Sequence, residues 1–226
     1  MSTAFAITLA ALLLCSLLSM LLFGVFGFRK ENKRGYSFLS DFPFELNEGR
    51  HPLSRVSAWS VFFLAAFLAL SSSTLLWNRD FAPYLPFAIV LAVLGALKAV
   101  SFVLLYRVPA YRFKFHILID VFYFCFAALS CAFMGIFFLN MRAANSPLAL
   151  GLMGVEVFLA VCLCLLALNP KLANWTQMSS TASEDGSVHL SRPKPFVLAF
   201  SEWIAIFLDC LSSSLFLLGV LFFEIA

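Results

Sequence analysis

Six long apolar blocks are the feature of this sequence that most restricts its fold. Each supplies the about 20 apolar residues that an α-helix needs to cross roughly 30 Å of hydrocarbon. The blocks cover residues 4–28, 56–77, 83–106, 115–139, 147–168 and 196–222. The pattern predicts an all-α fold, a polytopic transmembrane bundle of six spans that forms a single membrane domain over residues 1–226.

The composition excludes an ordinary soluble domain. Of the 226 residues, 62% are apolar and 12% are charged, whereas a soluble domain is roughly half apolar and a quarter charged. The net charge of +3 is modest, and the basic residues flank the apolar blocks, so we expect membrane lipid as the surroundings and no nucleic-acid partner. Arg29 and Lys30 follow the first block, which lacks a basic leader and is predicted to be a retained span.

The distribution of Lys and Arg predicts the orientation. Twelve of these residues fall in the connections 29–55, 107–114 and 169–195, whereas the other two connections hold only Arg79 and Arg142. The positive-inside rule assigns the three richer loops to the cytoplasm and both termini to the extracytoplasmic side. The compact loops favour a bacterial inner membrane, with an intracellular eukaryotic membrane as the alternative.

The two long loops carry different patterns. The first, 29–55, places aromatic and aliphatic residues between charges, which is typical of an interfacial anchor, with a gating lid as the alternative. These residues are Phe38, Leu39, Phe42, Phe44 and Leu46. In 169–195, an Asp185-Gly186 turn indicates a small hairpin, although the Ser and Thr content equally suits a mobile linker. Both loops are candidate docking surfaces for other membrane subunits.

Charged residues inside the spans are the most informative about function. A charge at the bilayer centre costs at least about 2.5 to 3.5 kcal/mol, so such residues are usually paired or face water. They are Lys98, Asp120, Glu156, Glu202 and Asp209. At about 1.5 Å per residue, three lie in a layer near the cytoplasmic side, and Glu156 and Asp209 lie in a deeper one.

Helical spacing groups these residues further. Glu202 and Asp209 are two turns apart and share one face of the last span, and His116 and Asp120 share one face of the fourth. We therefore predict a cytoplasmic-side cluster of Glu202, Asp120, Lys98 and His116. Glu156 and Asp209 are predicted to meet near the mid-plane, where two carboxylates hold a proton between them or bind a cation.

Purely structural roles are the alternative for each of these residues. Lys98 could extend its side chain to the interface, and Asp120 could form an interfacial ion pair with Arg112 or Lys114. Glu156 and Asp209 could be neutral acids that hydrogen-bond between helices. The Ser212-Ser213-Ser214 run could line a polar path or bond back to its own helix.

Ala88, Ala92, Gly95 and Ala99 form a stripe of small residues in the third span. Such a stripe lets two helices approach closely, so we predict a packing role for it.

No motif predicts a catalytic residue, a cofactor or a metal. The sequence has no phosphate-binding glycine loop, no zinc-protease helix and no nucleophile elbow. All six cysteines lie inside apolar blocks, and Cys162 and Cys164 point away from each other on a helix and cannot share a metal. The absence of signatures favours a protein that is not an enzyme.

Three functions fit the pattern. The first is a proton- or cation-linked transporter or channel component for a small solute, with Glu156 and Asp209 at its centre. The second is a non-catalytic subunit or scaffold of a larger membrane complex. The third is a membrane-embedded enzyme that modifies lipids and uses Asp120, His116 and Glu202.

Overall fold

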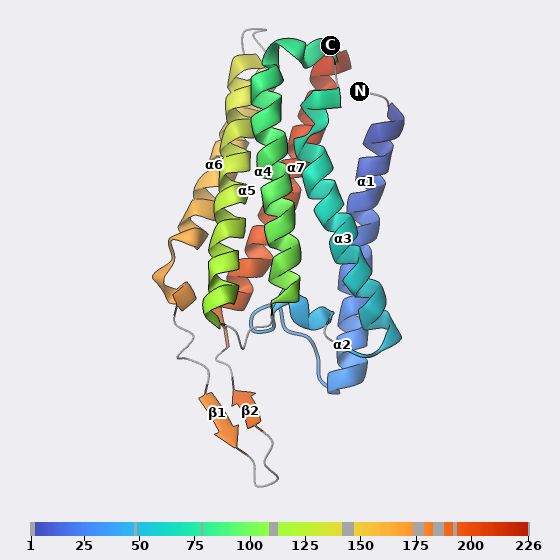
Figure 1. The fold of residues 1–226 in the computed structure, drawn as a ribbon, viewed down its shortest axis with the longest axis vertical. Helices are drawn as coiled ribbons and strands as arrows, with labels where there is room; N and C mark the ends of the chain where they lie inside the picture. The colour runs from blue at the N-terminus through green and yellow to red at the C-terminus, as the bar shows by residue number, and fades with distance from the viewer. Residues whose placement is uncertain are drawn as a thin grey trace.

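The computed structural model of this chain describes residues 3–47, 49–77, 79–108, 113–141, 147–173, 179–182, 188–191 and 194–225. Within these residues, six helices are long and apolar enough to cross a membrane. Figure 1 shows them side by side along the long axis of the molecule. The predicted six-span helical bundle is therefore confirmed.

The first span is a composite of three helical pieces: α1 (Thr3–Leu18), a π-helical turn (Ser19–Phe23) and α2 (Gly24–Asn32). A π-turn disrupts the regular ladder of backbone bonds, and here the hydroxyl of Ser57 lies 3.4 Å from the Met20 carbonyl oxygen within it. The helix ends at Lys33, whose left-handed backbone (φ 52°) stops the helical repeat.

The other five spans follow the predicted blocks closely. They are α3 (Pro52–Ser72), α4 (Leu85–Arg107), α5 (Phe113–Met141), α6 (Pro147–Ala167) and α7 (Val197–Ile225). Short 3-10 helices cover Pro43–Leu46, Thr74–Trp77, Arg79–Tyr84 and Pro170–Ala173. The start of α3 is set by Pro52 at its first position and by the His51 side chain, which accepts a hydrogen bond from the Leu53 backbone at 3.3 Å.

The bundle is organised around α7. This helix packs against α1, α3, α5 and α6, while α5 packs against both α4 and α6, and α3 against α1 and α4. Gly95 on α4 lies so close to α3 that a Cβ atom there would meet the Ser72 side chain. The small-residue stripe therefore packs as predicted at this position.

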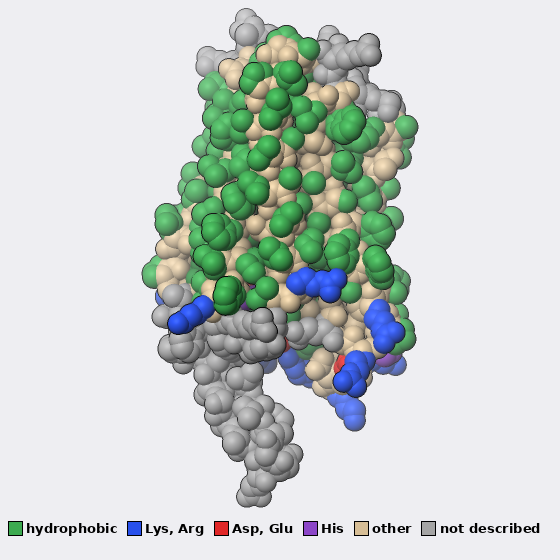
Figure 2. All heavy atoms as spheres, in the orientation of Figure 1, with side chains coloured by type: hydrophobic (Ala, Val, Ile, Leu, Met, Phe, Trp, Pro, Cys, Tyr) green, Lys and Arg blue, Asp and Glu red, His purple; other side chains and the backbone are tan. Residues whose placement is uncertain are grey.

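The surface and the interior of the bundle have opposite compositions. Large apolar side chains such as Trp59, Phe158 and Leu218 are exposed, and Figure 2 shows that apolar side chains cover most of the visible helical surface. The ionisable side chains that lie deep in the spans are instead completely buried: Lys98, His116, Asp120, Glu156, Glu202 and Asp209. This distribution suits lipid as the solvent, because lipid rewards apolar surface and penalises an exposed charge.

The two ends of the bundle differ. One end, which we call the hairpin end, carries α2, the 3-10 helix Pro43–Leu46 and a two-stranded ribbon (Figure 1). In the ribbon, β1 (Ser179–Ala182) pairs antiparallel with β2 (Val188–Ser191), and Ser179 lies opposite Ser191. The predicted hairpin is confirmed, although its Asp185-Gly186 turn lies outside the described residues. Helix α1 begins and α7 ends at the opposite end.

The first loop departs from the predicted interfacial anchor. Phe38 and Leu39 are exposed, as an anchor requires, but Phe42, Phe44 and Leu46 are buried. The rings of Phe42 and Phe196 contact edge to face, with centroids 5.4 Å apart. Most of the apolar side of this loop therefore packs into the bundle and does not turn to the acyl chains. We call residues 34–47 the docked segment.

Hydrogen bonds hold the docked segment against α7. The indole N–H of Trp203 donates to the Tyr36 hydroxyl at 2.9 Å. That hydroxyl lies 2.8 Å from the Phe42 carbonyl oxygen. Arg34 donates two hydrogen bonds, of 2.7 and 2.9 Å, to the Asp41 carboxylate. These bonds raise the pKa of Arg34, and burial raises the pKa of Tyr36, so the segment keeps these protonation states at neutral pH.

Candidate functional site

The predicted site residues are all fully buried inside the bundle. Each of the six has an exposed fraction of 0%. They come from four helices: Lys98 from α4, His116 and Asp120 from α5, Glu156 from α6, and Glu202 and Asp209 from α7. The structure separates them into two groups at different depths.

The deeper group is built around an ion pair. The Lys98 ammonium nitrogen lies 2.6 Å from Oδ1 of Asp209 and donates a second hydrogen bond, of 3.0 Å, to the Ser213 hydroxyl. The Tyr123 hydroxyl donates to Oδ2 of Asp209 at 3.2 Å. Each oxygen of the carboxylate thus has one donor. We call Lys98, Tyr123, Asp209 and Ser213 the lysine group.

Two predictions about Lys98 are wrong. It does not join the cluster near the hairpin end, and it does not extend to the interface. Its flexible four-carbon stem carries the ammonium to Asp209, and the whole side chain is buried. The physical reason is that helix packing places Asp209 and Ser213 of α7 within bonding distance of the ammonium, so its charge is compensated inside the bundle.

Glu156 also has a different partner from the predicted one. Its Oε2 atom accepts a 2.6 Å hydrogen bond from the Ser212 hydroxyl, and Ser212 in turn accepts a 3.1 Å hydrogen bond from the Cys131 thiol. Glu156 was predicted to contact Asp209 directly, but the two carboxylates are instead connected through serine side chains. Ser212 and Ser213 are neighbours on α7, so they link Glu156 on one side to the lysine group on the other.

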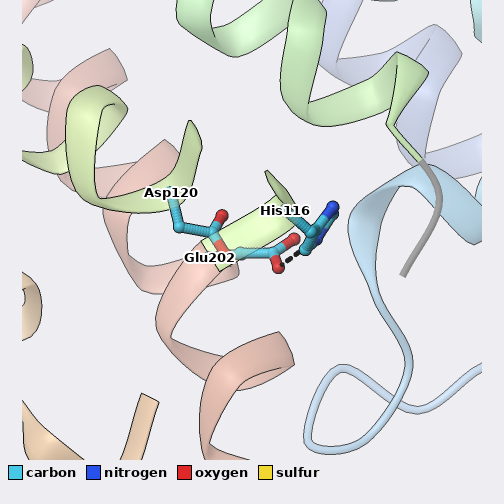
Figure 3. A group of neighbouring side chains, drawn as sticks. All are labelled: His116, Asp120 and Glu202. Carbon is cyan, nitrogen blue, oxygen red and sulfur yellow. Dashed lines mark hydrogen bonds and ion pairs between the residues drawn. The ribbon is translucent and has the colours of Figure 1, made fainter. Parts of the chain in front are cut away.

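The shallower group consists of His116, Asp120 and Glu202, which we call the triad (Figure 3). One ligating atom of each residue lies within 4.8 Å of the others. His116 Nε2 and Glu202 Oε1 are 3.0 Å apart. The predicted cluster of these three residues is therefore present without Lys98. For the alternative ion pair of Asp120, Lys114 is exposed and Arg112 lies outside the described residues.

The orientation of the His116 ring is set by the backbone. Its Nδ1 atom lies 2.7 Å from the Val108 carbonyl oxygen, and a carbonyl can only accept, so Nδ1 carries the hydrogen. The Nε2 atom then faces the carboxylate of Glu202. One proton is shared across that contact, because neither a bare imidazole nitrogen nor a bare carboxylate oxygen can bond to the other without it.

The docked segment covers the triad. The rings of Phe42 and Phe44 contact the His116 ring, with centroids 5.4 and 5.2 Å away. Phe44 also lines a cavity of about 110 Å³ between α3, α4 and the docked segment. Exposed Phe62 and Arg107 line the outer part of this cavity. Phe44 therefore lies between this cavity and the His116 ring, contacting both.

Three contributors to the site were not predicted from the sequence: Tyr123, Ser212 and Ser213. Tyr123 lies three residues after Asp120 and so shares its face of α5, which was the available signal. Ser212 and Ser213 belong to a run that was predicted either to line a polar path or to bond back to its own helix. Their partners Glu156 and Lys98 are far away in sequence, so no local spacing could connect them.

A comparison with protein-family models, with curated proteins and with solved structures finds no match to this chain. The class of protein follows from the fold and the site instead. Six apolar helices define an integral, multi-pass membrane protein. Within that class, this bundle has a core of ionisable side chains shielded from lipid.

Proposed function

We propose that this protein moves protons or a small cation across the membrane through the polar core between α4, α5, α6 and α7. The Lys98–Asp209 ion pair is the observation that carries the proposal. A buried salt bridge is rarely more stabilising than well-packed apolar side chains of the same volume. Stability alone therefore gives little reason to keep an ammonium and a carboxylate in the middle of a membrane bundle, whereas ion pathways use such groups routinely.

The polar groups on α7 extend along the helix and so support a pathway. From Glu202 through Asp209 to Ser213, the polar face extends over eleven residue-to-residue steps, which is about 16.5 Å at the α-helical rise. That is about half of the hydrocarbon thickness. Hydroxyl and carboxyl groups from α5 and α6 meet this face through Tyr123 and Glu156. Such a series of exchangeable groups suits stepwise proton transfer.

An aromatic cluster supports gating of this pathway. Beyond Ser213, the rings of Phe137 and Phe138 contact Phe216 of α7, with centroids 5.6 and 5.7 Å away. All three side chains are fully buried. A proton or cation that passes the lysine group meets this apolar constriction, so transport requires the rings to move. A bundle without such a closure would dissipate the membrane potential.

The basic residues support the predicted orientation. Figure 2 shows Lys and Arg side chains gathered toward the hairpin end of the bundle, below the apolar surface. We assign the hairpin end to the cytoplasm on this basis. The loops 29–55 and 169–195 would then face the cytoplasm, where docking of other membrane subunits stays a prediction.

Reconstitution tests the proposal. The purified chain is placed in liposomes that hold a pH-sensitive dye, and a potassium diffusion potential drives proton entry, with Na⁺ or K⁺ gradients tested in parallel. We expect flux above that of empty liposomes for the wild type, and loss of that flux for Asp209→Asn. Glu31→Gln is the matched control, because Glu31 caps the backbone of Arg50 at 2.8 Å outside the polar core.

A double variant distinguishes loss of transport from misfolding of the protein. The double variant Lys98→Met, Asp209→Leu removes both charges together and so preserves the fold without the ionisable groups. Flux that persists in this folded double variant would refute the proposal. So would a wild-type protein that transports neither protons nor either cation.

A further inference from the structure

The triad has the residue types and the spacing of a metal site. It offers one imidazole nitrogen and two carboxylate groups, and a ligating atom from each lies within 4.8 Å of the others. We propose that His116, Asp120 and Glu202 bind a first-row divalent cation of the Zn²⁺ type. The inference rests on the triad alone and does not depend on transport through the lysine group.

Asp120 supplies an independent observation that points to a ligand. Its side chain is completely buried, and neither carboxylate oxygen has a hydrogen-bond partner among the described residues. In Figure 3 its carboxylate points toward that of Glu202. A buried carboxylate without a partner is costly. A cation held between Asp120 and Glu202 supplies the missing partner and removes the repulsion between them.

The His116 ring already makes the supporting hydrogen bond that is typical of a metal-binding histidine. Metal-binding histidines almost always donate the hydrogen of their other ring nitrogen to a carbonyl or a carboxylate. His116 does this through Nδ1 and the Val108 carbonyl oxygen at 2.7 Å. The lone pair of Nε2 is thereby aimed at the carboxylates, and a cation would take the place of the proton that Nε2 shares with Glu202.

Charge and coordination chemistry select the class of ion. Two carboxylates, one neutral imidazole and one divalent cation sum to zero, which suits a dry interior. Ca²⁺ requires six to eight oxygen ligands and Mg²⁺ keeps several waters, whereas Zn²⁺ accepts mixed nitrogen and oxygen ligands in a four-coordinate site. Bonds of about 2.1 Å place tetrahedral ligands roughly 3.4 Å apart, so a small rotation of the carboxylates closes the triad.

The structure offers an entry route and an open coordination position. Three protein ligands leave a fourth position, as in zinc sites that bind water or a substrate. The cavity of about 110 Å³ reaches Phe44, whose ring contacts His116. Movement of this side chain is the step that we expect to admit the ion from the cavity to the triad. The ion enters from the hairpin end without passing the aromatic closure of the bundle.

Metal titration of the full chain in detergent micelles tests the inference. Zn²⁺ binding is followed by calorimetry, and Co²⁺ serves as a spectroscopic probe because four-coordinate cobalt absorbs strongly in the visible range. We expect one ion per chain, and affinity at least about tenfold weaker in Asp120→Asn, because removing even outer-shell partners costs 10–100-fold. A rise in Tm with Zn²⁺ should occur in the wild type and not in this variant.

Two control variants make the result specific. His51→Asn combined with His189→Asn removes the other two histidines of the chain and should leave the affinity unchanged. Glu156→Gln changes a buried acid outside the triad and should also bind Zn²⁺ normally. The inference is overturned if folded wild-type protein binds no Zn²⁺. Equal binding by wild type and Asp120→Asn, or binding that disappears in the histidine control, would also overturn it. Because binding is read without flux, either proposal can fail alone.

Discussion

The buried ion pair between Lys98 and Asp209 gives the sharpest prediction about stability. Three variants are compared with the wild type: Lys98→Met, Asp209→Leu and the double variant. In Lys98→Met, the Tyr123 hydroxyl is the one donor to the Asp209 carboxylate that remains among the described residues. In Asp209→Leu, the Ser213 hydroxyl is the one hydrogen-bond partner of the Lys98 ammonium that remains within the described part of the chain. Each single change therefore leaves one charge in the bundle interior with a neutral partner alone.

The magnitude follows from the complete burial of both side chains. Removing one partner of such a pair costs about 3–5 kcal/mol, whereas replacing both by apolar side chains of similar volume is close to neutral. If the two changes were independent, the double variant would lose about 6–10 kcal/mol by addition of these single losses. We expect it to lose less than either single variant, so the coupling energy should exceed about 3 kcal/mol.

Reversible unfolding in mixed micelles measures the free energy of unfolding for all four proteins. The pair Arg34 and Asp41 is the matched control, because the Arg34 side chain is 50% exposed. Asp41 is buried, but water screens the half-exposed Arg34 guanidinium, so the coupling in this pair should be smaller than in the fully buried pair. Additive losses in the Lys98 and Asp209 cycle, or equal coupling in both pairs, would refute the reasoning.

Three further predictions test the packing and the polar contacts. Gly95→Ala should lower the free energy of unfolding by about 1–3 kcal/mol, because its Cβ meets the α3 side chain opposite. Gly151→Ala, whose Cβ meets nothing within 4 Å, should not. Ser212→Ala should cost about 1–3 kcal/mol in the same assay, since it leaves the Glu156 carboxylate without this donor. The raised pKa of Tyr36 means that the folded state keeps a proton that the unfolded state loses above about pH 10. Stability should therefore fall as pH rises beyond that value, and Tyr36→Phe should reduce the measured slope by about 1.4 kcal/mol per pH unit.

The six spans could be predicted from the sequence because each one depends only on residues within the same segment. A helix in lipid satisfies its own backbone, and about 20 apolar residues are enough to identify it. Block 147–168 and the observed α6 (Pro147–Ala167) start at the same residue. The grouping of His116 with Asp120 was equally accessible, because four residues make one helical turn.

The hydrogen-bond partners of Lys98 and Glu156 could not be predicted in this way, because they are set by contacts between helices. Lys98 bonds to Asp209 across 111 residues of chain, and Glu156 bonds to Ser212 across 56. Which serine or carboxylate each one meets depends on how α4 and α6 are rotated and shifted against α7. Packing between helices sets those quantities, and a sequence pattern within one helix carries no information about them.

In the docked segment too, one property was predicted from the sequence and another was decided by the tertiary structure. Its alternation of charges with Phe and Leu correctly indicated affinity for an apolar environment, but lipid and protein interior reward the same side chains. Hydrogen bonds from Trp203 and the backbone of Phe196 decided between them, since they tie the segment to α7. The sequence by itself thus determined the lipid environment, the six spans and which ionisable residues fall inside them, because each depends on the composition of one segment. Only the tertiary structure decided which of those residues form the ion pair and which form the triad, because that depends on how separate helices face one another.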